Sequence, residues 1–156
     1  MSSLPTINEA EEQTDSAGLL DPATGWYRQW YAQLRLSEEI IRANRYKRAL
    51  AVVTIRLPSD PQTPLNRGAL LAALSEIGAR ELRAIDLPGI LGRHAYFVIL
   101  PETDKAGAKV VARRLAATMG AFAAVIGVAD YPKDGKTIED LLFNARAFKV
   151  PPHARA

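Results

Sequence analysis

The spacing of apolar residues along the chain predicts an alternation of helices and strands. Residues 26–47 have apolar side chains every three or four positions, which is the period of an amphipathic helix. Residues 49–57 form a continuous apolar run of strand length, and Pro58 ends it, so this run is the expected central strand. The apolar positions that define the first helix are Trp26, Trp30, Leu34, Ile40 and Ile41.

Segments with helical spacing and segments of strand length continue along the rest of the chain. Residues 68–82 and 104–119 have helical spacing, and the second of these segments carries Val110, Val111 and Leu115 on its predicted inner face. Residues 122–129 are expected to form a strand, and Thr137 can cap a last helix that reaches about Phe148.

A β-hairpin is predicted between these helices. The apolar runs 87–91 and 96–100 flank the polar turn Gly92-Arg93-His94. The resulting order is helix, strand, helix, strand, strand, helix, strand, helix. This order predicts an α+β fold, an α/β sandwich in which helices pack on a mixed central sheet.

Length and composition fit one domain. The chain has 156 residues, which suffices for a substantial core, and it contains no cysteine, so disulfides and thiolate chemistry are excluded. It has neither a secretory signal pattern nor an apolar stretch of the roughly 20 residues that span a bilayer, so we expect no membrane segment and a cytoplasmic location. The predicted organisation is an acidic tail (1–19), a folded domain (20–150) and a C-terminal tail (151–156).

Charge is distributed unevenly. Residues 1–20 carry a formal charge of −4, which leaves +7 on the remainder of a chain whose net charge is +3. A basic domain favours anionic partners, although an excess of arginine on a solvated surface gives the same composition. The segment 42–48 is basic but lacks interleaved aromatic residues, so nucleic acid is not a favoured partner.

Several motifs together resemble the GGDEF domain of diguanylate cyclases. Asp21-Pro-Ala-Thr-Gly-Trp-Tyr27 resembles the D-P-L-T-G-L-Y entry of that family, and residues 52–57 resemble its first core strand. Residues 97–104 are similar to the segment after its signature, residues 126–135 to its I-G-V-A-x-Y-P-x-D-G strand and turn, and residues 138–145 to its last helix. The resemblance covers about residues 20–149 and implies the nucleotide-cyclase-like fold.

The same resemblance implies a degenerate signature. The residues at the Gly-Gly-Asp-Glu-Phe positions of the family are Gly92, Arg93, His94, Ala95 and Tyr96. Arg56 falls on the metal-binding aspartate of the first strand and Pro58 on the acidic position two residues later. Joining two GTP molecules requires metal ions held by carboxylates. We therefore expect no metal site, no cofactor and no cyclase activity.

One family feature is retained. Arg83-Ala-Ile-Asp86 stands five residues before Gly92, the spacing at which diguanylate cyclases carry an R-x-x-D site for cyclic di-GMP. An arginine can hold a phosphate or guanine edge, and a carboxylate can accept from guanine N–H groups. Arg80 can add positive charge, unless it is simply a solvent-facing helix residue. The alternative for Arg83 and Asp86 is a surface ion pair of little consequence.

The resemblance thus gives two main hypotheses, beside a third, enzymatic one that would need residual GTP or other phosphotransfer chemistry. The first is an inactive GGDEF-like domain that acts as a cyclic di-GMP receptor through Arg83, Asp86 and Arg80, and that regulates a protein partner. The second is a ligand-free interaction module that pairs with itself or with another protein.

Overall fold

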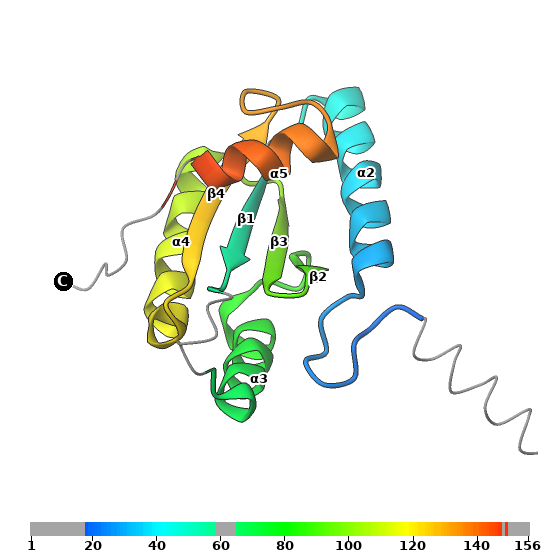
Figure 1. Ribbon diagram of the computed structural model, residues 1–156. Helices are drawn as coiled ribbons and strands as arrows, with labels where there is room; N and C mark the ends of the chain where they lie inside the picture. The colour runs from blue at the N-terminus through cyan, green and yellow to red at the C-terminus, as the bar shows by residue number, and fades with distance from the viewer. Residues whose placement is uncertain (1–17, 59–64, 148, 150–156) are drawn as a thin grey trace, which may run out of the picture.

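The computed structural model describes residues 18–58, 65–147 and 149, with the side chain of residue 147 excepted. The predicted C-terminal tail, and all but the last two residues of the predicted acidic tail, lie outside these ranges. Within them, the structure is an α+β fold in which helices cover both faces of one sheet (Figure 1).

Four strands form the sheet in the order β2-β3-β1-β4. The strands are β1 (Leu50–Arg56), β2 (Leu87–Gly92), β3 (Ala95–Pro101) and β4 (Val125–Tyr131). The apolar run of β1 explains its position, because β1 lies between two neighbours and its residues Leu50 to Ile55 are buried. All three pairings are antiparallel, so the expectation of a mixed sheet was wrong and the α+β class is confirmed. The predicted hairpin is also confirmed as β2 and β3.

Helices cover the two faces of the sheet in pairs. Helices α2 (Gln29–Tyr46) and α5 (Ile138–Ala147) contribute to the core on one face. The other face is covered by α3 (Arg67–Glu76), by the π-helical turn η1 (Ile77–Glu81) that continues it, and by α4 (Lys105–Met119). A short 3-10 turn, η2 (Gly120–Phe122), joins α4 to β4.

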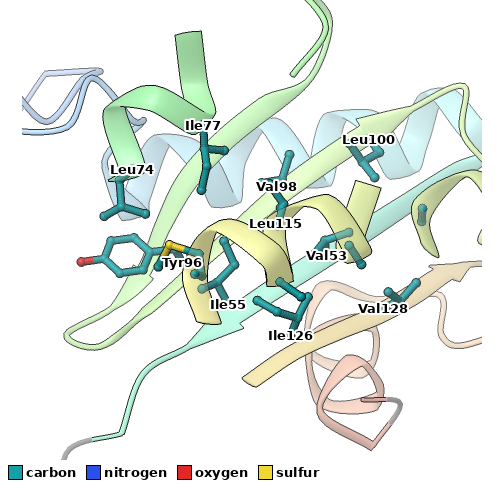
Figure 2. Packing of buried hydrophobic residues seen from close by; sticks show 14 of the residues in the cluster. Val53, Ile55, Leu74, Ile77, Tyr96, Val98, Leu100, Leu115, Ile126 and Val128 are labelled. Atoms are coloured by element: carbon teal, nitrogen blue, oxygen red, sulfur yellow. The ribbon is translucent and has the colours of Figure 1, made fainter. Parts of the chain in front are cut away.

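Side-chain alternation along β1 separates the two cores. Val53 and Ile55 point into the cluster under α3 and α4, where Leu115 of α4 packs against them (Figure 2). Val52 belongs to the opposite cluster, together with the inner residues of α2 and α5. This alternation places Arg56, which follows Ile55, on the same face as Val52.

The inner face of α2 differs from the predicted one. Its buried residues include Ala32 and Leu36, whereas Trp30, Leu34 and Ile41 are exposed. Small residues are required here because the helix approaches β2 closely. A Cβ atom on Gly89 of β2 would lie 2.4 Å from the Cβ of Ala32.

Trp26 precedes α2 and belongs to the opposite core. Its indole Nε1 donates a hydrogen bond of 2.8 Å to the carbonyl of Leu74, and its ring meets Tyr96 edge-on. The next residue, Tyr27, pairs with the outer edge of β2 through its N–H to Pro88 O and its carbonyl to Ile90 N, each at 2.9 Å. This segment therefore covers the edge strand and fixes the start of α2.

Candidate ligand-binding site

Arg83 and Asp86 lie in the turn that connects η1 to β2. The turn is closed twice: Asp86 N donates to Arg83 O at 3.0 Å, and Arg83 N donates to Asp86 Oδ2 at 2.8 Å. A short acidic side chain that accepts from a backbone N–H three residues away is a common device for fixing turns. The local sequence therefore holds the two residues at a defined separation.

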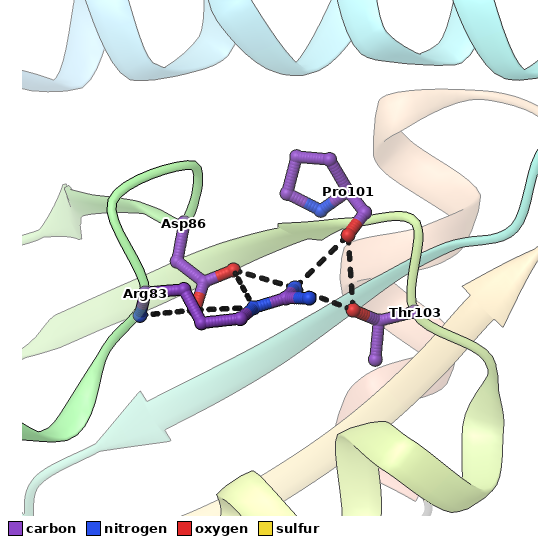
Figure 3. A network of polar contacts seen from close by, with 4 residues as sticks. All are labelled: Arg83, Asp86, Pro101 and Thr103. Atoms are coloured by element: carbon purple, nitrogen blue, oxygen red, sulfur yellow. Dashed lines mark hydrogen bonds and ion pairs between the residues drawn. The ribbon is translucent and has the colours of Figure 1, made fainter.

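The guanidinium group of Arg83 is fixed by several acceptors (Figure 3). Its Nη2 donates to Asp86 Oδ1 at 2.8 Å, to Thr103 Oγ1 at 2.7 Å and to Pro101 O at 3.0 Å. Its Nε lies 3.2 Å and 3.3 Å from the two Asp86 oxygens. Thr103 Oγ1 also donates to Pro101 O at 3.0 Å, which links the turn to the end of β3.

The two members of this pair differ in exposure. The Asp86 side chain is 2% exposed, whereas that of Arg83 is 50% exposed. Both Asp86 oxygens accept from Arg83, so the carboxylate is engaged within the turn and is not presented to solvent. The sequence-based hypothesis gave Asp86 a direct contact with guanine. The geometry instead suits it to orient the guanidinium group of Arg83.

A pocket of about 500 Å³ lies beside this pair. Arg114 of α4 lines it together with Arg83, and these two arginines come from segments about 30 residues apart in the sequence. The acidic residues Glu102 and Asp104 also line this pocket. The full lining is Ala49, Arg83, Asp86, Glu102, Thr103, Asp104, Gly107, Val110, Val111 and Arg114.

Arg114 was not singled out by the sequence reasoning. A signal was present in the spacing, since Val110 and Arg114 are four residues apart and share one helix face. Val110 is 52% exposed, so this face borders the pocket instead of the core. The prediction that Val110 points inward was wrong.

Arg80, the third predicted ligand residue, lies on η1 and outside this pocket lining. Its Nε is 3.3 Å from a carboxylate oxygen of Glu76, and its side chain is 75% exposed. The structure therefore brings Arg83 and Asp86 together but places Arg80 on an exposed helical surface.

The residues of the predicted degenerate signature form the tip of the β2–β3 hairpin. Gly92 pairs with Ala95, and the turn between them holds Arg93 and His94. His94 O accepts from Leu57 N at 2.8 Å, which ties the turn to the end of β1. Tyr96 is buried against Trp26, and burial raises the pKa of its phenol.

The hairpin tip and the end of β1 do not supply the oxygen ligands that a Mg²⁺ ion requires. Ala95 is the register partner of Arg56, the last residue of β1. Residues 56–58 and 92–96 contain no carboxylate, whereas Mg²⁺ prefers oxygen ligands with negative charge. Across residues 18–58, 65–147 and 149, no group of three or more His, Asp or Glu side chains is placed to hold a metal ion.

In the same ranges, no helix has the length and apolar character needed to cross a bilayer.

Comparison with known proteins finds no matching family model and no matching curated protein. Solved structures do match. A sensory box/GGDEF family protein from Caulobacter crescentus has a TM-score of 0.70 and 24% identity, over 84% of this chain and 95% of that one. The GGDEF domain of PA1120 (YfiN or TpbB) from Pseudomonas aeruginosa has a TM-score of 0.67 and 26% identity, over 80% of this chain and 88% of that one.

A third similar structure is the coiled coil and GGDEF domain of DgcB from Caulobacter crescentus, in complex with c-di-GMP. It has a TM-score of 0.71 and 12% identity, over 94% of this chain and 86% of that one. Each of these three structures aligns with 80% or more of this chain. The chain therefore has the fold of a GGDEF domain.

Proposed function

We propose that this chain is a non-catalytic GGDEF-like domain that binds cyclic di-GMP beside Arg83 and thereby regulates a protein partner. The observation that carries the proposal is the side chain of Arg83, which is fixed by hydrogen bonds yet 50% exposed, at a pocket that Arg114 also lines. A preoriented arginine loses little conformational freedom when it binds a ligand. The pocket volume of about 500 Å³ lies in the range of small-molecule sites.

The polar groups of this pocket suit a guanine dinucleotide. The fork of Arg114 can donate to O6 and N7 of guanine or to a phosphate. Arg83 can add its Nη1 group, because its Nε and Nη2 already donate within the protein. Glu102 and Asp104 supply carboxylates that can accept from the guanine N1–H and amino groups. The role of Asp86 in this proposal is to hold Arg83 in place.

The structural neighbours support the same ligand class. The DgcB structure contains c-di-GMP, and its fold is shared by this chain. The diguanylate cyclase SiaD from Pseudomonas aeruginosa is another neighbour, with a TM-score of 0.65 and 19% identity, and its structure holds its activator SiaC. A GGDEF fold that contacts a regulatory protein is therefore a suitable precedent for a relay to a partner.

The proposed loss of cyclase chemistry depends on three side chains. Arg56 puts a positive charge at the end of β1, while His94 and Ala95 provide no carboxylate at the hairpin. Developing phosphoryl charge would then lack the metal ions that neutralise it. Incubation with GTP and Mg²⁺, followed by chromatography, should yield no cyclic di-GMP, and formation of the product would refute this part of the proposal.

Isothermal titration calorimetry with cyclic di-GMP tests the binding site. Arg83→Ala and Arg114→Ala should each weaken binding about tenfold or more, because a hydrogen bond to a charged group contributes about 1.5–3 kcal/mol. Arg113→Ala is the matched control, since Arg113 is an exposed neighbour on α4 that does not line the pocket. The proposal would be refuted if the native chain gave no heat at tens of micromolar ligand. It would also be refuted if Arg83→Ala and Arg114→Ala bound the ligand as tightly as Arg113→Ala does.

A second candidate function is ligand-independent interaction with a protein. It is favoured by the exposed apolar side chains of α2, where Trp30, Leu34 and Ile41 are 50%, 45% and 66% exposed. Their spacing of four and seven residues places them along one side of the helix. Light scattering distinguishes the two functions, because self-association through this helix would raise the mass without nucleotide and would be lost in Leu34→Glu.

A further inference from the structure

The outer side of α2 carries a row of apolar side chains that the domain leaves uncovered. This apolar row consists of Trp30, Leu34 and Ile41, which are exposed and lie along one side of the helix. Leu19 and Leu20 are exposed as well, and a main-chain hydrogen bond of 2.7 Å to Leu19 O holds them beside the start of α2. Exposed apolar side chains gathered in one place mark a surface that meets an apolar partner.

The C-terminal end of the same helix is basic. Arg45 lies four residues after Ile41 and therefore on the same side of α2. A pocket of about 480 Å³ brings Lys47 and Arg48 together with Lys136, which belongs to the turn between β4 and α5. Among the described residues, those that line this pocket include no acidic side chain. Figure 1 shows α2 at one side of the domain, with this turn beside its C-terminal end.

The positive charge of this basic end exceeds what the helix itself requires. The C-terminus of a helix carries about half a negative charge, which one cation offsets. Arg48 is paired with Glu102 at 3.2 Å. Arg45, Lys47 and Lys136 add three further basic side chains at the same place. The apolar row therefore ends at a basic surface that suits an anionic partner.

An anionic lipid bilayer matches both parts of this surface. Tryptophan and aliphatic side chains favour the boundary between headgroups and acyl chains, and anionic headgroups attract lysine and arginine. A second copy of α2 matches the apolar row alone. The two acidic residues of this helix, Glu38 and Glu39, already pair with Arg35, so a second copy of the helix would bring no unpaired carboxylate to the basic end.

We propose that the outer side of α2 docks this domain on an anionic membrane surface. The apolar row enters the interface between headgroups and acyl chains, and the basic end contacts lipid phosphates. The pocket lined by Lys47 and Lys136 receives the phosphate of one headgroup. No member of the apolar row lines the pocket beside Arg83, so membrane docking leaves that pocket open to its own ligand.

Co-sedimentation of the full chain with vesicles tests this surface. At about 50 mM salt, vesicles of phosphatidylcholine with about 30% phosphatidylglycerol should bind at least about tenfold more tightly than phosphatidylcholine alone. Lys47→Gln combined with Lys136→Gln should weaken this binding roughly 20-fold, because each basic side chain near an anionic surface contributes about fivefold. Arg67→Gln combined with Arg113→Gln is the charge-matched control, since both residues are exposed on helices of the opposite face, and it should weaken binding less than about threefold.

Fluorescence shows whether the apolar row enters the lipid. The chain has two tryptophans, of which Trp26 is buried and Trp30 is 50% exposed. Anionic vesicles should therefore shift the emission of Trp30 to shorter wavelength, and Trp30→Phe should abolish the shift but keep most of the binding. Leu34→Ser combined with Ile41→Ser should weaken binding about tenfold or more, because less apolar surface leaves water.

Three results overturn the proposal. They are a native chain that does not sediment with anionic vesicles, equal binding by the two charge-matched double variants, and an unshifted emission of the bound chain. A chain that self-associates through α2 and does not bind vesicles has a protein partner on this helix instead. Arg83→Ala should bind vesicles as the native chain does, so a failure of cyclic di-GMP binding leaves membrane docking unaffected.

Discussion

The ion pair between Arg83 and Asp86 predicts a strongly non-additive double-mutant cycle. Asp86→Ala removes the acceptor of the Arg83 main-chain N–H and the partner of its guanidinium group. Arg83→Ala leaves a carboxylate that is 2% exposed in the native structure with the main-chain N–H as its remaining Arg83 donor. The double variant removes both charges, so only the main-chain N–H of residue 83 is left without its acceptor.

The magnitude follows from burial. A buried polar group without its partner costs about 1–3 kcal/mol. The ionic part of the interaction contributes at most about 1 kcal/mol, because Arg83 is 50% exposed and solvent screens its charge. Each single variant should therefore lose about 2 kcal/mol of unfolding free energy. The double variant should lose about the same amount, which gives a coupling of roughly 1.5–2 kcal/mol.

Urea unfolding at pH 7, followed by the fluorescence of the buried Trp26, measures all four chains of the cycle. The control cycle is Arg80→Ala with Glu76→Ala, an ion pair whose side chains are 75% and 49% exposed. Its coupling should stay below about 0.5 kcal/mol. Additive losses for Arg83 and Asp86, within about 0.5 kcal/mol, would refute the view that Asp86 holds Arg83 in place.

Two other predictions concern stability. Gly127→Ala should lose about 2–3 kcal/mol in denaturant unfolding, because the new Cβ would lie 1.9 Å from the carbonyl oxygen of Ala145. Gly120→Ala is its control and should be neutral or slightly stabilising, since no atom lies within 4 Å of its Cβ position and its φ is −60°. Burial, and next the neighbouring Asp134, raise the pKa of the Asp130 carboxyl above 3.8. As the pH rises and this carboxyl ionises, the folded state therefore loses stability relative to the unfolded chain. Asp130→Asn should therefore gain melting temperature over the native chain between pH 4 and pH 7, and a constant difference would contradict this sign.

Local patterns sufficed to predict most elements of this fold. The hairpin, the central strand and the helix order each depend on periodicity and turn residues within about 20 positions, and the structure confirms them. The faces of the helices were less predictable. Ala32 packs inward and Trp30 outward because α2 must approach Gly89 closely, and that requirement comes from β2.

For the candidate site as well, some features could be predicted from the sequence and others were decided only by the structure. The sequence by itself determined that Arg83 and Asp86 stand three residues apart just before a strand. That Arg56, His94 and Ala95 fall on acidic positions of the GGDEF family is an expectation from the resemblance. These are properties of single positions and short spacings.

The tertiary structure alone decided what these residues contact. It assigned the Asp86 oxygens to Arg83 and brought Arg114 to the same pocket. It also brought Arg146 of α5 near Arg56 of β1. The physical reason is that burial and electrostatic environment arise from contacts between segments far apart in the chain, which the packing of helices on the sheet creates.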